Sequence, residues 1–205
     1  MLTSRGAMFG LDARITLFVF ALLSTVTGFV LYQRAEEAQD IKLYADIQEM
    51  ELALKIMQRD LGVLPGYAHT DGIGTSSDDM FLMFCNSAFV ASGFQKRWKG
   101  PYLNKTNCST NSGTYKTLSI GYYVAYASAS GVDSSTPPGN APNACTVTGD
   151  CYAWIGVDAT EEAFAYINRI VDELNGATTE VSPEDNGRVI LYNTNQIWYR
   201  TEVHQ

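Results

Sequence analysis

Histidine and the common catalytic motifs are scarce in this chain of 205 residues. Only His69 and His204 occur, 135 residues apart, and the nucleophile motif G-x-S-x-G is missing. A catalytic nucleophile usually needs a neighbouring general base, most often a histidine. The sequence therefore argues against an enzyme, and it predicts no catalytic residue and no cofactor-binding residue.

The C-x-x-C pairs that are typical of zinc sites are also missing. The four cysteines are Cys85, Cys108, Cys145 and Cys151. An even number in an exported domain indicates two disulfides, for which three pairings exist, and zinc is a weaker alternative because histidine is so rare. Closeness in sequence favours the pair Cys145–Cys151, and elimination then leaves Cys85 with Cys108.

A surplus of positive charge is lacking. Lysine and arginine number 14 against 22 acidic residues, a net charge of −8. Residues 1–34 have a balance of +2, so the remainder carries −10. A nucleic-acid partner is not predicted, because such proteins usually present a basic face. Acidity of this kind keeps an exported domain soluble.

Proline does not occur before Pro65, and Gly28 is the only glycine between Arg14 and Leu61. This stretch therefore predicts one nearly continuous helix over residues 15–61, and Gly28 is the place where it would bend or melt, at a cost of about 1 kcal/mol relative to Ala. Residues 15–32 contain no charge. At about 1.5 Å per residue, they are just long enough to cross a bilayer core of about 30 Å.

Three interpretations of this apolar run compete. A cleaved signal would need a small-x-small site after the run, where bulky residues stand instead. A core helix of a soluble protein is disfavoured because the run is apolar all round. A membrane anchor remains, and its flanks set the orientation: Arg5 and Arg14 precede it, whereas Glu36, Glu37 and Asp40 follow it. The positive-inside rule leaves the N-terminus in the cytoplasm and sends the rest outside.

The second half of the predicted helix is amphipathic. One set of apolar residues recurs at intervals of three or four positions, namely Leu43, Ile47, Met50, Leu54, Met57 and Leu61. Such spacing places them on one helix face. Gly62 is the predicted cap and Pro65 the stop.

The rest of the chain predicts a β-rich head. Strands are expected at residues 117–128 and 152–158, and a hairpin joins residues 187–192 to 196–201. A short helix is expected within residues 80–92, and another begins with a capping box at Asp158 and Glu161. The fold class is α+β: a long N-terminal helix packed on an antiparallel sheet. The segments are residues 1–14 (N-terminal segment), 15–34 (hydrophobic helix), 35–62 (amphipathic helix) and 63–205 (head).

Some acidic loop residues could bind calcium, namely Asp78, Asp79, Asp150, Glu184 and Asp185. Solvated loop carboxylates are the simpler interpretation, so no metal site is predicted. The 12 tyrosines and three tryptophans could likewise form a sugar-binding face, but strand core and subunit contacts explain them more simply.

The layout of helix, turn and sheet, together with the motif WKGPYL at Trp98 to Leu103, resembles the type IV pilin superfamily, which includes the pseudopilins of type II secretion. The stretch GLDARI at Gly10 to Ile15 is also similar to pilin-like proteins. The resemblance implies a structural subunit that polymerises with its own copies through the N-terminal helix. It further implies residence in the bacterial inner membrane before assembly, dependence on an assembly machinery, and an extracellular filament.

The N-terminus departs from the family pattern. The family's processing site is a glycine followed by an apolar residue, with glutamate fifth. Here the acid after Gly6 comes sixth and is Asp12. This argues against processing by a prepilin peptidase. In the family the acid pairs with the N-terminal amine of a neighbouring subunit, whereas Asp12 could equally cap the helix N-terminus.

The residues expected to pack between subunits are Asp12, Arg14, Phe18, Phe20, Leu22, Leu23, Gly28, Phe29 and Leu31. Close packing at Gly28 and satisfaction of the hydroxyls of Ser24 and Thr27 are expected to add to the association. The alternatives are a membrane-anchored periplasmic binding module and a minor pseudopilin of a secretion system.

Overall fold

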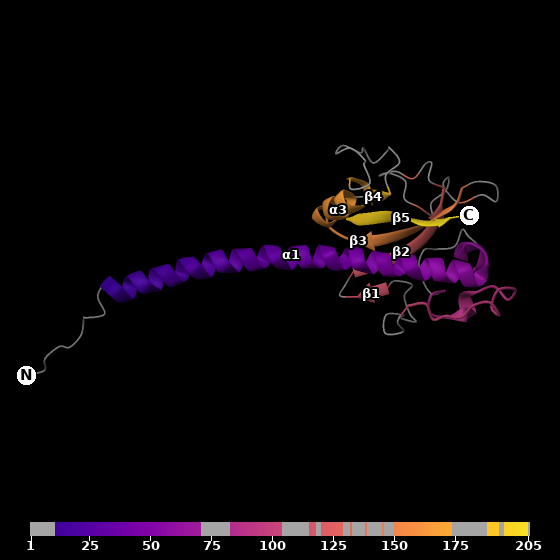
Figure 1. Cartoon of the computed structure of the whole chain (residues 1–205), viewed down its shortest axis with the longest axis horizontal. Coiled ribbons are helices and arrows are strands. Elements are labelled where there is room, and N and C mark those ends of the chain that lie inside the picture. Colours follow the sequence, from indigo (N-terminus) through magenta and orange to yellow (C-terminus); the bar gives the residue numbers. More distant parts are fainter. Residues whose placement is uncertain are drawn as a thin grey trace, which may run out of the picture. The chain divides into compact units, whose positions relative to one another are not determined.

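The computed structural model describes residues 11–70, 83–103, 115–117, 120–128, 132, 138, 145, 150–173, 188–192 and 195–204. The chain divides into two compact units, Met1–Lys42 and Leu43–Gln205. Its main elements are the long helix α1 (Leu11–Leu61) and one antiparallel sheet (Figure 1). The predicted α+β class is confirmed. The predicted segment boundaries at residues 14, 34 and 62 stay predictions.

Helix α1 is unbroken over its 51 residues, which confirms the prediction of one helix over residues 15–61. It begins at Leu11 rather than Ile15. Gly28 does not interrupt it, because a penalty of about 1 kcal/mol is small beside the cooperative hydrogen bonding of a helix without proline.

The C-terminal end of α1 is closed as the sequence predicts. Gly62 has a φ of 75°, a left-handed conformation that favours glycine, and its N–H donates to the carbonyl of Gln58 at 2.8 Å. Arg97 Nη1 donates to the carbonyl of Leu61 at 3.1 Å. Pro65 then opens the 3-10 helix η1 (Pro65–Ala68), where its missing N–H costs nothing.

The WKGPYL motif holds the connector after α1 in place. Trp98 Nε1 donates to the carbonyl of Met83 at 2.9 Å. The hydroxyl of Tyr102 donates to Asp60 Oδ2 at 3.2 Å and accepts from the backbone N–H of Lys99 at 3.0 Å. The motif therefore fixes the connector against the last turn of α1.

Replacing Gly100 by alanine should destabilise this connector. An added Cβ would lie 2.5 Å from Cζ2 of Trp98 and 2.9 Å from Cδ2 of Tyr102, so both rings would have to move. Overpacking of this kind typically costs about 1–3 kcal/mol. Thermal or urea unfolding should show this loss. Gly93→Ala is the matched control, because a Cβ there meets no described atom within 4 Å; equal stability of the two variants would contradict the assignment.

The sheet contains five strands in the order β1-β2-β3-β5-β4, and all described pairs are antiparallel. The strands are β1 (Tyr115–Thr117), β2 (Ile120–Ala127), β3 (Tyr152–Asp158), β4 (Val189–Tyr192) and β5 (Gln196–His204). The predicted hairpin is confirmed as the β4–β5 pair. The strand predicted over residues 117–128 is confirmed as β2 over Ile120–Ala127, but its predicted start is wrong, because Thr117 belongs to β1 and pairs with Ile120.

Both sheet faces are buried by alternating side chains. The predicted α1 stripe is fully confirmed, with exposures of 0–4%, and it packs in one core with Val124, Ile155 and Ile197. Residues one position away point to the other face, where Trp154 and Trp198 are buried. These tryptophans therefore belong to the core rather than to an open binding face.

Helix α3 (Glu161–Asn168) starts differently from the prediction. Thr160 is the N-cap, and its hydroxyl accepts from the N–H of Ala163 at 3.4 Å. The predicted cap, Asp158, ends β3 and instead accepts from the hydroxyl of Tyr123 at 3.0 Å. Hydrogen bonding across the sheet keeps Asp158 away from the helix. A π-helical turn, η4 (Arg169–Glu173), follows α3.

The short helix predicted within residues 80–92 is wrong for the part described. Only the three-residue 3-10 turn η2 (Ser87–Phe89) forms there. The side chain of Asn86 accepts from the N–H of Ala88 at 2.9 Å, a local bond that competes with a longer helix.

One predicted disulfide is confirmed. Cys145 bonds to Cys151, with their Cα atoms 5.4 Å apart. Cys85 is also disulfide-bonded. Its predicted partner, Cys108, lies outside the described residues, so the pair Cys85–Cys108 stays a prediction.

Candidate functional site

The first candidate site is the apolar part of α1, residues 15–32, here named the apolar segment. It lies within the stretch Ala13–Leu61, which is long and apolar enough to cross a membrane, with a mean hydropathy of 2.1 and no burial in its most apolar window. The large apolar side chains are 46–69% exposed, and they are Ile15, Leu17, Phe18, Val19, Phe20, Leu22, Leu23, Val26, Phe29, Val30, Leu31 and Tyr32. So much apolar surface indicates a protein or lipid partner.

The predicted packing residues lie on all sides of this helix. Among the apolar ones the exposure runs from 50% at Leu22 to 69% at Phe20. Arg14 is exposed, and an added Cβ at Gly28 would meet no described atom within 4 Å. Asp12 lies in α1, but its side chain is outside the described part of the chain.

One expectation about this segment is corrected. Thr27 Oγ1 donates to the carbonyl of Leu23 at 2.7 Å, and Thr25 Oγ1 donates to the carbonyl of Leu22 at 2.8 Å. The hydroxyl of Thr27 is therefore satisfied within its own helix and needs no hydrogen bond from a neighbouring subunit. The apolar segment can lie in lipid with these polar groups already paired.

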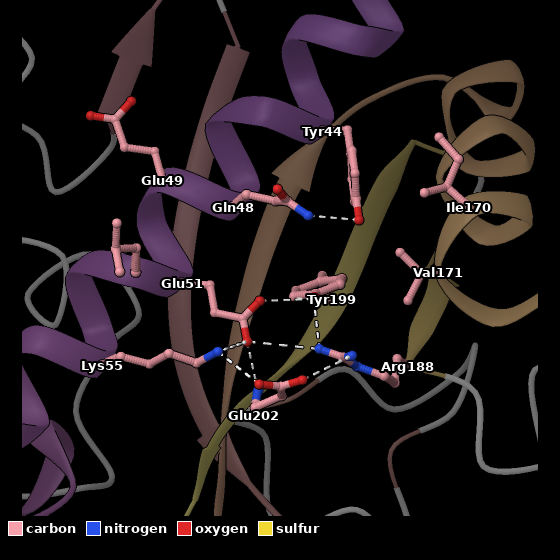
Figure 2. A pocket seen from close by; sticks show the side chains of 11 residues that line it. Tyr44, Gln48, Glu49, Glu51, Lys55, Ile170, Val171, Arg188, Tyr199 and Glu202 are labelled. Carbon is pink, nitrogen blue, oxygen red and sulfur yellow. Dashed lines mark hydrogen bonds and ion pairs between the residues drawn. The ribbon is translucent and has the colours of Figure 1, made fainter. Parts of the chain in front are cut away.

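The second candidate site is a cleft of about 650 Å³ in the head, beside α1 (Figure 2). Its walls come from α1, η4, β5 and the residue before β4. The lining residues are Tyr44, Gln48, Glu49, Glu51, Leu52, Lys55, Ile170, Val171, Arg188, Tyr199 and Glu202. Four charged side chains, those of Glu51, Lys55, Arg188 and Glu202, gather at one end, and the apolar side chains of Ile170 and Val171 line the wall on the η4 side (Figure 2).

Glu51 is the centre of the charged end. It is buried, at 7% exposure, and its Oε2 accepts from the hydroxyl of Tyr199 at 2.8 Å. Its Oε1 accepts from the backbone N–H of Glu202 at 2.9 Å and lies 3.2 Å from Lys55 Nζ and 3.7 Å from Arg188 Nη2. A buried carboxylate is tolerated only with such partners.

These contacts shift the acid–base properties of the cleft. Burial, followed by the Glu51 carboxylate, raises the pKa of Tyr199 well above its usual value. The hydrogen bond between Lys55 and Glu202, 2.7 Å long, raises the pKa of Lys55 and lowers that of Glu202. At neutral pH Tyr199 is therefore a hydrogen-bond donor, and Lys55 and Glu202 are a charged pair.

The charged end of the cleft fastens two elements of the head together. It ties β5 to α1, and Gln58 Nε2 adds a further tie to the carbonyl of His204 at 2.9 Å. The described lining residues include no serine, cysteine or histidine. The two cations are engaged by Glu51 and Glu202.

Removing the charge of Glu202 should cost little stability and should do so in a pH-dependent way. Because its folded pKa is lowered, the charged pair contributes above about pH 4.3, the ordinary unfolded value, and is lost as the pH falls through the lowered value. Glu202 is 62% exposed, so Glu202→Gln should cost only about 0.2–1 kcal/mol at pH 7 and less at pH 3. Urea unfolding at both pH values measures this, with Glu49→Gln as an exposed control. A loss as large at pH 3 as at pH 7 would contradict the pairing.

Sequence reasoning missed Glu51 and two other partly or fully buried acids of α1. Glu51 lies four residues after Ile47 and three before Leu54, so its spacing placed a carboxylate on the buried face. Asp46 and Asp60 lie outside the predicted apolar stripe, and they accept from the hydroxyls of Tyr122 and Tyr102.

No metal site emerges from the described residues. They contain no group of three or more histidine, cysteine, aspartate or glutamate side chains that could hold an ion. Asp150, one of the possible calcium ligands, is exposed. Asp78, Asp79, Glu184 and Asp185 lie outside the described residues.

No protein family, curated protein or solved structure was found to match the chain. The class is therefore defined by architecture alone: an α+β protein with a long, apolar N-terminal helix and an antiparallel sheet. This arrangement is compatible with a pilin-like architecture.

Proposed function

We propose that the protein is a structural subunit of an extracellular type IV pilus-like filament and that it assembles through the apolar segment. The observation that carries this proposal is the exposure of twelve large apolar side chains on one helix that is joined to a well-packed head. A filament core gives every copy the same surface to bury, so no separate partner is needed.

The energetics favour a membrane stage before assembly. Fully burying each of these side chains from water stabilises by roughly 1.5–3 kcal/mol. Contact with lipid already provides most of this stabilisation, so transfer of the side chains from lipid to a filament core gains much less free energy. We therefore place the subunit in the inner membrane first, with the head outside the cytoplasm, and assign its transfer into the filament to an assembly machinery.

A second candidate function is a membrane-anchored periplasmic binding module, or a minor pseudopilin of a secretion system. Two observations favour it. The hydroxyls of Thr25 and Thr27 are satisfied within α1, as a lone anchor requires. The head also has an open cleft of about 650 Å³ that a ligand could enter.

Negative-stain microscopy of material sheared from the cell surface separates these functions. Filaments that carry the chain, identified by an antibody to the head, are expected for a filament subunit. Recovery of the chain only in detergent extracts, with no labelled filaments, would refute the first function and support the second.

A further inference from the structure

A group of cations surrounds the C-terminal end of α1, here named the basic corner and made of Arg59, Lys96, Arg97 and Lys99. All four are exposed. Arg59 Nε lies 3.8 Å and Lys99 Nζ 3.7 Å from Oδ1 of Asp60, and Arg97 binds the carbonyl of Leu61. The folding of the connector onto α1 therefore brings together charges that are about 40 residues apart in sequence.

The basic corner is locally positive in a chain of net charge −8. Among the described residues, the carboxylate in contact with it is Asp60, which already accepts from Tyr102 and has a side chain only 8% exposed. A cavity of about 350 Å³ opens beside it, lined by Gln58, Arg59, Gly62, Val63, Leu64 and His204. The corner can therefore receive a protruding acidic side chain as well as face an acidic surface.

The opposite end of the head is acidic. Strand β5 runs alongside α1, because Tyr199 contacts Glu51 and His204 contacts Gln58. Asp158 pairs with Gln196 at the far end of β5, about 26 Å from His204 at about 3.3 Å per residue. Glu161 and Glu162 follow at the start of α3, and all three acids are exposed. Figure 1 shows α3 at the end of the sheet away from the C-terminus.

We propose that the basic corner of one copy binds the acidic edge of a second copy, formed by Asp158, Glu161 and Glu162. The inference rests on the proposed filament function and names one of its subunit contacts. The acidic edge is the expected partner because its charge is opposite to that of the basic corner. Since the two surfaces lie at opposite ends of the same head, each copy can offer one surface to each of two neighbours. A contact between two different surfaces of identical copies can be repeated from copy to copy. Unless the rotation between neighbours closes a ring, the repeated contact extends an open filament.

A charge swap in the full-length chain tests this contact. Lys96→Glu with Lys99→Glu turns attraction to the acidic edge into repulsion, and this should reduce the filament yield by about tenfold. Adding Glu161→Lys and Glu162→Lys should restore it. The matched control, Lys42→Glu with Arg169→Glu, makes the same change in net charge at exposed positions away from the corner and should keep the wild-type yield. Head folding is checked by thermal unfolding of each variant.

The outcomes separate this contact from the filament function itself. Wild-type filaments that are unaffected by the double substitution would overturn the contact and leave the filament function standing. Loss without rescue by the swap would refute the acidic edge as the occupant. If the wild-type chain forms no filaments, the function and the contact fail together.

Discussion

Replacing Leu22 by lysine should abolish filaments and leave the head folded. Leu22 lies near the middle of the apolar segment and is 50% exposed in the single chain, so it is not part of the buried core of the described head. A lysine at the centre of a membrane span costs about 2.5–3.5 kcal/mol, and an unpaired charge inside a filament core costs more. Because the gain from lipid to core is small, this penalty is enough to prevent assembly. Negative-stain counting of sheared filaments measures the effect.

Leu22→Met is the matched control, because it keeps an apolar side chain of similar volume and should give wild-type filaments. Protease resistance of the head should be the same in both variants. Normal filaments from the lysine variant would show that the apolar segment is not the assembly element.

Replacing Leu54 by aspartate should unfold the head. Leu54 is 0% exposed and lies in the core between α1 and the sheet. Aspartate would place a charge there without a partner, at a cost of several kcal/mol. That is a large part of the total stability of about 5–15 kcal/mol expected for a domain. Circular dichroism and proteolysis of a fragment covering residues 35–205 would report the loss.

Leu52 offers a close control two residues away. Its side chain is 57% exposed on the same helix, so Leu52→Asp should leave the fragment folded. If the Leu54→Asp fragment were soluble, protease-resistant and folded, the packing of α1 on the sheet would be wrong.

The helix and its buried face could be predicted from the sequence because both depend on local spacing. The absence of proline before Pro65 defines the helix, and the recurrence of apolar residues by three or four defines the face that becomes buried. Each strand with clear apolar character was also found, since the faces of a strand alternate regardless of its neighbours.

The errors come from contacts that are distant in sequence. The acceptor role of Glu51 depends on Tyr199, which is 148 residues away, and only the folded sheet brings them together. Asp158 resembles a helix cap in sequence, but Tyr123, 35 residues earlier, engages it across the sheet. Thr117 and Ile120 pair across two strands although they lie in one uninterrupted β-like pattern, so periodicity alone does not separate β1 from β2.

The two candidate sites differ in the same respect. The apolar segment follows from composition, and the structure adds that its side chains are exposed and that the hydroxyls of Thr25 and Thr27 are paired within the helix. The cleft and the basic corner arise from tertiary folding, since each combines residues from α1 with residues from later elements.

Electron cryomicroscopy of filaments sheared from cells that produce this chain would test the central claim most directly. The account predicts that the apolar segments of neighbouring copies pack against one another along the filament axis, with Phe18, Phe20 and Leu22 buried between them. A reconstruction in which the heads make all the contacts between copies, or in which the apolar segment lies outside the filament core, would contradict it.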